Sequence, residues 1–187
     1  KRTLLLRHLL QAHAWPSVLV FVASRHGADH VTDKLGRAGI AAAALHADLS
    51  QGARVRALEG LKSGAVKVLV ATDVAARGLD VRQLSAVVNY DLPRSPTDYV
   101  HRIGRTGRAG EAGVAVSFVT ADADAHFALI ERRHRLSIAR EQLPGFERTE
   151  VATPSRDPHG GVKGKRKSKK DKLRVQAWLD AQTKPKG

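Results

Sequence analysis

Two hydrophobic patterns alternate along the first 145 residues of the chain. The first pattern is a short continuous apolar run, which is typical of strands covered on both faces. The runs that predict strands are 17–23, 40–45, 66–72, 84–90 and 113–120. Elsewhere apolar residues recur every three or four positions, as on the buried face of a helix. The stretches that predict helices are 1–14, 26–39, 50–64, 95–103 and 121–135.

The alternation of buried-type strands with helices predicts an α/β fold. We expect a parallel sheet of about five strands with helices on both of its faces. From Pro144 onward the pattern ends, and turn-forming and charged residues replace it. The predicted organisation is therefore a folded domain over residues 1–148 and a basic, largely disordered tail over residues 149–187.

The distribution of charge points to a polyanionic partner. The chain carries a net charge of +14, and residues 151–187 hold eight Lys and three Arg against three Asp, a net charge of +8. Such a tail either binds phosphates in a salt-dependent way or only keeps the protein soluble. Trp178 in the tail either stacks on a base or packs in a short helix. The tail cations that we expect to bind phosphates are Lys165, Arg166, Lys167, Lys169 and Lys170.

The composition indicates the cellular compartment in which the protein is expected. The chain contains no cysteine, which excludes disulfides and thiolate metal sites and favours a reducing compartment. No apolar run reaches the roughly 20 residues of a membrane span, and the amino-terminal segment lacks a signal-peptide pattern. We therefore expect a cytoplasmic protein that has no membrane partner.

Two segments concentrate residues that suit phosphate chemistry. ATDVAARGLD at 71–80 follows a predicted strand, and HRIGRTGR at 101–108 lies between a predicted helix and a predicted strand. Guanidinium groups match phosphate oxygens with a planar fork of donors, and Gly104 and Gly107 permit close backbone approach. A solvated basic loop is the alternative. Ligands of parallel sheets bind at the carboxyl ends of the strands, where we expect both segments.

In this order and spacing the two segments resemble the C-terminal RecA-like domain of DEAD-box RNA helicases. VVNYDLP and DYVHRIGRTGR, together with the HADLSQGARVRALEGLKSG stretch, extend the resemblance to roughly residues 1–148. LPGF followed by a basic tail resembles the bacterial RhlE-like branch.

The resemblance implies a nucleotide-binding role for three residues and a domain-coupling role for a fourth. Arg105 and Arg108 match arginines that reach the γ-phosphate of ATP held on a partner domain. Asp80 matches the position that binds the ATP ribose. His101 matches a position that couples the two domains, although a packed histidine is the alternative reading.

The resemblance also implies contacts to RNA. Thr72 and Gly78 match positions near the RNA backbone, and Gln51 and Arg54 match a Q-x-x-R motif whose arginine binds RNA phosphate. The tail cations would add further phosphate contacts. Ala47 departs from the family, which commonly has glycine there, and this puts the local contacts of Asp48 in doubt.

Several polar residues of the same segments have alternative readings. We expect a structural role for Arg102, and either an internal salt bridge or an RNA contact for Arg77. Asp73 either organises its loop or contacts its neighbours, and Phe21 mainly packs. His46 and Asp48 have no third partner of metal-ligating type, so no metal site is predicted.

The sequence lacks the motifs that hold ATP itself. It contains no P-loop, no DEAD tetrapeptide for Mg²⁺ and no adenine-binding motif. We therefore expect half of a two-domain motor, with ATP and Mg²⁺ held mainly by an N-terminal RecA-like domain, and no ATPase activity from this part alone. The alternatives are a non-catalytic RNA-binding or annealing module and a DNA helicase of a neighbouring branch.

Overall fold

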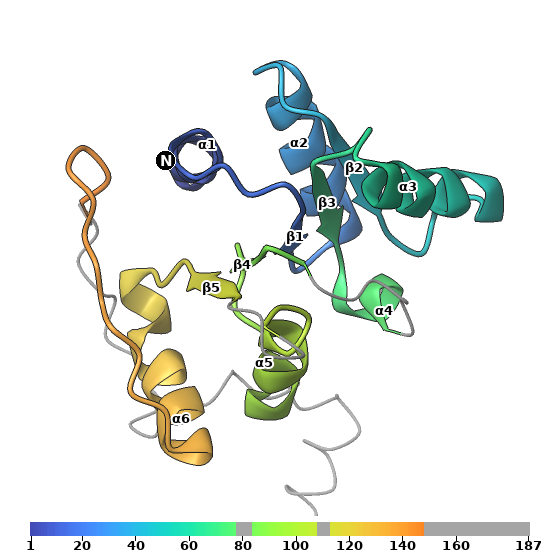
Figure 1. Ribbon diagram of the computed structural model, residues 1–187. Helices are drawn as coiled ribbons and strands as arrows, with labels where there is room; N and C mark the ends of the chain where they lie inside the picture. The colour runs from blue at the N-terminus through green and yellow to red at the C-terminus, as the bar shows by residue number, and fades with distance from the viewer. Residues whose placement is uncertain (78–83, 108–112, 148–187) are drawn as a thin grey trace, which may run out of the picture.

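Five short parallel strands form a single sheet at the centre of the molecule (Figure 1). The computed structural model describes residues 1–77, 84–107 and 113–147. The strand order is β2-β3-β1-β4-β5, and every neighbouring pair is parallel. This confirms the predicted parallel sheet of five strands. The strands are β1 Val18–Phe21, β2 Ala42–Leu45, β3 Val68–Ala71, β4 Ala86–Asn89 and β5 Val114–Ser117.

The helices also follow the predicted pattern, with two differences. The four-residue helix α4, Asp73–Ala76, was not predicted, because a single turn is too short to show a helical period. The last predicted helix divides into a 3₁₀ turn, Ala121–Ala123, and α6. The α-helices are α1 Arg2–Ala12, α2 Arg25–Gly36, α3 Gln51–Ser63, α4 Asp73–Ala76, α5 Pro96–Ile103 and α6 Asp124–His134.

Serine caps set where three helices begin. The hydroxyls of Ser24, Ser50 and Ser95 each accept a hydrogen bond from the backbone N–H three residues later, at the starts of α2, α3 and α5. Such a cap satisfies an N–H that has no partner within the helix. Each of these helices follows a strand, so the caps also fix the loops at the carboxyl edge of the sheet.

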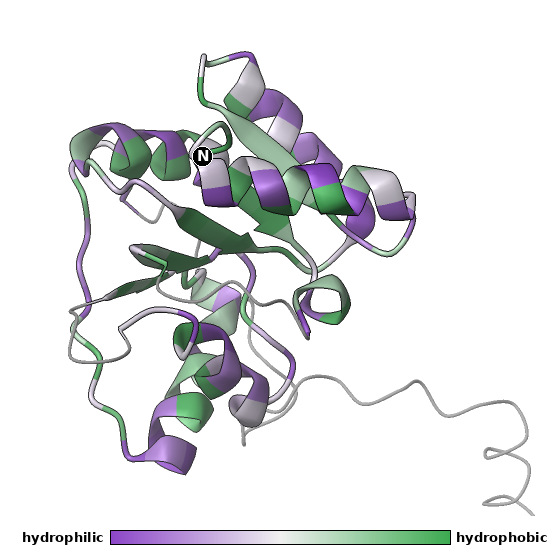
Figure 2. Ribbon diagram, turned by 45° about the vertical axis from the view of Figure 1, so that its right-hand side comes forward, coloured by the Kyte–Doolittle hydropathy of each residue, from purple (hydrophilic) through white to green (hydrophobic). Residues whose placement is uncertain are grey.

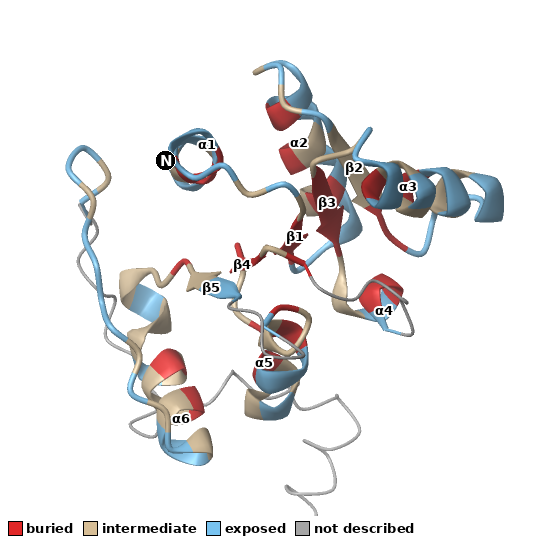
Figure 3. Cartoon of the chain, in the orientation of Figure 1, coloured by how far each residue is buried: buried red, intermediate tan, exposed pale blue. Residues whose placement is uncertain are grey.

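Both faces of the sheet are covered by helices. Side chains of successive strand residues point to opposite faces. On β1, Val18 and Val20 pack with α1 and α2, whereas Leu19 and Phe21 pack with α3 and α4. Figures 2 and 3 show the result: the central strands are hydrophobic and buried, and the polar residues lie on the outer faces of the helices.

A third cluster joins α5 to α6. Tyr99 from α5 and Phe127 and Ile130 from α6 are buried together, and the rings of Tyr99 and Phe127 meet edge to face with their centroids 5.8 Å apart. Segment 136–147 then returns along this cluster toward α1, as the orange trace in Figure 1 shows. Phe146 there lies 5.4 Å from the ring of His8. The segment thus connects the carboxyl-terminal part of the domain to its first helix.

The predicted tail, residues 149–187, lies outside the described residues. Among the described helices, none combines the length and the apolar character that a membrane crossing requires.

We predict that Phe127→Ala lowers the free energy of unfolding by about 3–5 kcal/mol, because Phe127 is 1% exposed and its loss leaves a cavity. Phe146→Ala is the matched control. Its ring is only partly buried, so we expect a loss of about 1 kcal/mol or less. Urea denaturation measures both variants. Equal losses would show that the α5–α6 cluster is not a stabilising core.

Candidate nucleotide and nucleic-acid interface

Arg102 occupies the centre of the candidate site and is only 3% exposed. Its Nε and Nη2 donate to the two carboxylate oxygens of Asp73 at 2.6 and 2.7 Å. Its Nη1 donates to the side-chain oxygen of Asn89 at 3.0 Å and to the backbone oxygen of Asp91 at 2.6 Å. Its guanidinium also lies 4.7 Å from the ring centroid of Phe21. We call this set of contacts the Arg102 clamp, and it confirms the structural role predicted for Arg102.

The Arg102 clamp joins segments that are far apart in sequence. Asp73 begins α4 after β3, Asn89 ends β4, and Arg102 lies in the last turn of α5. The carboxylate of Asp91 accepts from Arg2 of α1 at 2.6 Å and from the backbone N–H of Ala23 at 2.9 Å. The loops that follow β1, β3 and β4 are therefore held together at the carboxyl edge of the sheet.

A chain of hydrogen bonds extends the clamp to β5. Asn89 donates from Nδ2 to the hydroxyl of Ser117 at 3.1 Å, and the hydroxyls of Ser117 and Tyr99 lie 3.2 Å apart. Burial raises the pKa of the Tyr99 phenol, so this hydroxyl keeps its proton at neutral pH. The hydrogen bond between α5 and β5 is therefore present over the physiological pH range.

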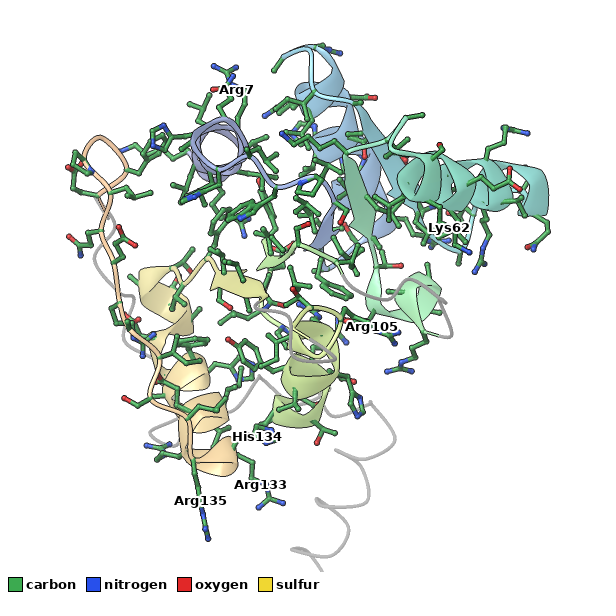
Figure 4. The ribbon with its side chains drawn as sticks, viewed as in Figure 1. Arg7, Lys62, Arg105, Arg133, His134 and Arg135 are labelled. Carbon is green, nitrogen blue, oxygen red and sulfur yellow. The ribbon has the colours of Figure 1, made fainter. Side chains whose placement is uncertain are left out.

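The segment after α5 is fixed by Leu84. The backbone carbonyl of Arg105 accepts a hydrogen bond from the backbone N–H of Leu84 at 3.4 Å, and the hydroxyl of Thr106 donates to the carbonyl of Leu84. A Cβ on Gly113 would collide with Thr106 and with the backbone of Gly107, so glycine is required for this close approach. Gly107 itself has a φ of 65°. These contacts hold the backbone of Arg105, whose side chain lies between α5 and α4 in the view of Figure 4.

This placement corrects one prediction. Segment 71–80 does begin at the carboxyl edge, because Thr72 and Asp73 follow β3 directly. Segment 101–108 does not lie there as a whole. Leu84, the partner of Thr106, precedes β4, so Arg105 and Thr106 are at the amino-terminal end of that strand. The reason is that α5 starts beyond the carboxyl edge and runs back along the sheet.

Three of the predicted RNA-binding residues lie at neighbouring positions on the carboxyl edge. Gln51 and Arg54 are in the first turns of α3, which follows β2, and Thr72 follows β3. β2 and β3 are adjacent, and the backbone N–H of Thr72 donates to Leu45 at the end of β2 at 3.2 Å. Gln51 is exposed, whereas Arg54 and Thr72 are partly buried. We call this pair of strand ends the β2–β3 edge.

His46 and Asp48 have partners of their own. His46 is 5% exposed, and its Nε2 lies 2.9 Å from the carboxylate of Asp29 on α2. Asp48 forms an ion pair with Arg25. Within the described parts of the chain, no group of three or more histidine and carboxylate side chains is arranged to hold a metal ion.

The structure shows where Arg77 and His101 lie, and an RNA contact of Arg77 stays a prediction. Arg77 lies 3.4 Å from the carboxylate of Asp98 on α5, although its side chain is 69% exposed. The internal salt bridge is thus formed. His101 is exposed in the last turn of α5, so the reading of a packed histidine is wrong, and its coupling role stays a prediction.

Sequence reasoning missed Asn89 and Asp91 as partners of Arg102. The signal for Asn89 was present, since it is a polar residue in the apolar run 84–90 and is fully buried. A buried amide needs hydrogen-bond partners. Three predicted residues, Gly78, Asp80 and Arg108, lie outside the described part of the chain, as do the tail cations.

Comparison with known proteins identifies the family. Residues 1–110 match the model of the helicase conserved C-terminal domain. The chain belongs to this family. The ATP-dependent RNA helicase DeaD of Mycobacterium tuberculosis (strain ATCC 25618 / H37Rv) is 42% identical to the helicase C-terminal domain described here over 142 residues, which are 76% of this chain and 25% of DeaD.

Solved structures place the helicase C-terminal domain among DEAD-box proteins. The E. coli DEAD-box protein SrmB, solved bound to the regulator of ribonuclease activity A, has a TM-score of 0.71 and 38% identity, and the match covers 82% of this chain and 91% of the chain in that structure. S. cerevisiae Dbp5, solved bound to RNA and ADP BeF3, has a TM-score of 0.65 and 38% identity, over 70% of this chain and 35% of Dbp5. The DEAD-box C-terminal fold and family predicted from the motifs are confirmed.

The helicase C-terminal domain is much shorter than its curated relatives. It spans 25% of DeaD and 31% of the helicase CshA of Geobacillus kaustophilus (strain HTA426).

We predict that Arg102→Lys lowers the free energy of unfolding by about 3 kcal/mol. An ammonium keeps the charge but not the fork that donates to Asp73 and Asn89 together, and buried acceptors are left without donors. The control is Arg77→Lys, whose exposed ion pair should change stability by less than about 0.5 kcal/mol. Urea denaturation checks both. If the two variants are equally stable, the Arg102 clamp does not hold the site together.

Proposed function

We propose that the chain is the C-terminal lobe of an ATP-dependent RNA helicase. In this proposal, an N-terminal RecA-like domain of the same protein holds ATP and its Mg²⁺, and this lobe supplies arginine side chains to the nucleotide. The observation that carries the proposal is the position of Arg105. It follows the Arg102 clamp by three residues, and its backbone is held by Leu84.

Arg105 is suited to a role in phosphoryl transfer. During transfer, negative charge is spread over the oxygens of the moving phosphoryl group, and a positioned guanidinium stabilises that charge. Such a contribution depends on prior positioning, because a donor already in place needs no reorganisation as the reaction proceeds. Arg108 is proposed as a second arginine at the same phosphate, and Asp80 as the residue that binds the ribose.

The β2–β3 edge is the proposed RNA contact. The hydroxyl of Thr72, the amide of Gln51 and the guanidinium of Arg54 are all able to donate to phosphate oxygens. Phosphates carry no base identity, so we expect little sequence preference. The structural relative Dbp5 has been solved with RNA and ADP BeF3, which supports the combination of these two ligands on one fold.

The two proposed contacts lie at different ends of the sheet, and the Arg102 clamp connects them. Asp73 follows Thr72 at the β2–β3 edge, and it is bonded to Arg102, three residues before Arg105. We propose that closure of the two domains brings both contacts into use at once, with exposed His101 touching the other domain. Local strand separation follows as the RNA backbone is bent. A cytoplasmic location and membership of the RhlE-like branch remain part of this proposal.

In the full-length helicase, we predict that Arg105→Ala lowers kcat for ATP hydrolysis by at least about 10³-fold, while the Kd for ATP changes little. The charge that Arg105 meets is greatest in the transition state, so its removal affects the rate more than ground-state binding. Lys62→Ala is the control, because Lys62 is an exposed cation in the last turn of α3.

Steady-state ATPase assays with RNA, together with nucleotide titrations, give the two quantities. A normal kcat for Arg105→Ala would contradict the proposal, and so would an equal loss in the Lys62→Ala control.

A further inference from the structure

Four exposed arginines gather where the end of α6 meets the start of α5. Arg132 and Arg133 lie in the last turn of α6, Arg135 follows that turn, and Arg94 comes just before α5. We call this group the α6 corner. In Figure 4, Arg133 and Arg135 extend away from the body of the molecule, whereas His134 lies on the side of α5.

Two histidines of α6 hold the α6 corner in place. The Nε2 of His134 lies 2.8 Å from the carbonyl of Pro96, and the Nε2 of His126 lies 2.7 Å from the carbonyl of Pro93. The arginines flank these bonds in sequence: Arg133 and Arg135 adjoin His134, and Arg94 lies between the two prolines. The corner is therefore part of the fixed contact between α6 and the segment that leads into α5.

Nearby carboxylates do not neutralise the α6 corner. Glu131 binds Arg140 at 2.8 Å and accepts from the backbone N–H of Ile138 at 3.2 Å. Asp98 binds Ser95 at 2.9 Å and Arg77 at 3.4 Å. Among the residues that the structure describes, no carboxylate forms an ion pair with any of the four corner arginines.

Stabilisation of the helix end accounts for only part of this arrangement. Cations at the C-terminus of α6 are favoured by about 0.3–1 kcal/mol each through the helix dipole. This explains Arg132 and Arg133. It does not explain Arg94, which belongs to a different element and lies before the N-terminus of α5, where a cation is disfavoured.

The location of the α6 corner indicates its ligand. It lies beyond the carboxyl end of β4, at the same edge of the sheet as the β2–β3 edge. Strands lie about 4.8 Å apart, so β5, which leads into α6, is about 19 Å from β2, and the corner is at the far end of α6, whose 11 residues extend about 16 Å. A nucleic-acid strand of several nucleotides covers that span, and guanidinium groups match its phosphates.

We propose that the α6 corner binds the phosphate backbone of the same RNA strand, several nucleotides beyond the β2–β3 edge. The inference rests on the proposed function, because it requires RNA at the β2–β3 edge. It assigns to α6 a role in extending the RNA footprint past the helicase motifs.

The test compares two lengths of RNA on the full chain. Uridine oligomers of four and twelve nucleotides are titrated by fluorescence anisotropy over a salt series. At about 3.4 Å per stacked nucleotide, the shorter oligomer spans about 10 Å and does not reach from the β2–β3 edge to the corner. The variants are Arg133→Gln/Arg135→Gln at the corner, Arg54→Gln at the edge, and Arg7→Gln/Lys62→Gln as a control that removes the same charge elsewhere (Figure 4).

We expect the corner variant to bind the twelve-nucleotide RNA about 25-fold more weakly at 0.1 M salt, with a log–log salt slope shallower by about 1.4, as two lost single-strand phosphate contacts give. Its affinity for the four-nucleotide RNA should stay within about twofold of the parent, as should the control's affinity for both lengths. Arg54→Gln should weaken binding of both lengths.

The outcomes separate the inference from the proposed function. If Arg54→Gln weakens binding but the corner variant does not, or if the corner variant weakens both lengths equally, the inference is wrong and the β2–β3 edge stands. If the corner variant does not weaken RNA binding, the corner arginines either only stabilise the end of α6 or bind another anionic partner. If Arg54→Gln changes neither length, the RNA edge itself is wrong, and with it the proposed function.

Discussion

The buried guanidinium of Arg102 is the constraint on which the rest of the site depends. A charge in a protein interior is tolerated only when its donors are satisfied. Four hydrogen bonds to Asp73, Asn89 and Asp91 meet this requirement, and the ring of Phe21 covers the group. Because the guanidinium is planar and its donors are fixed, those partners can take only one arrangement around it. The loops after β3 and β4 are thereby held in register with α5.

The direction of α5 links the Arg102 clamp to both proposed contacts. The helix begins beyond the carboxyl edge and ends near Leu84, so it connects the two ends of the sheet. Arg102 is bonded to Asp73, next to the proposed RNA contact, and Arg105 lies where the nucleotide contact is proposed. A shift of Arg102 would therefore alter both proposed contacts together. Arg105 follows the end of α5, and its backbone N–H donates to the carbonyl of Arg102 at 3.1 Å, so a tight turn links the two arginines.

The fold could be predicted from the sequence because strands and helix starts are each marked by residues that are close together in the chain. Runs such as 17–23 and 66–72 have the composition of strands buried on both faces, and Ser24, Ser50 and Ser95 mark helix starts. The contacts of Arg102 could not be predicted, because Asn89 and Asp91 meet it only after the chain has folded. The position of Arg105 was misjudged for a similar reason: spacing identified the motif, but only the course of α5 shows which end of the sheet it reaches.

The central claim is that this lobe presents arginines to a nucleotide that another domain holds. The most direct measurement is RNA-stimulated ATP hydrolysis by the 187-residue chain alone, folded by circular dichroism, beside the full-length helicase at equal concentration. The account predicts turnover by the full-length protein and none above background by the chain alone. Robust RNA-stimulated turnover by the purified chain, free of contaminating ATPase, would contradict it.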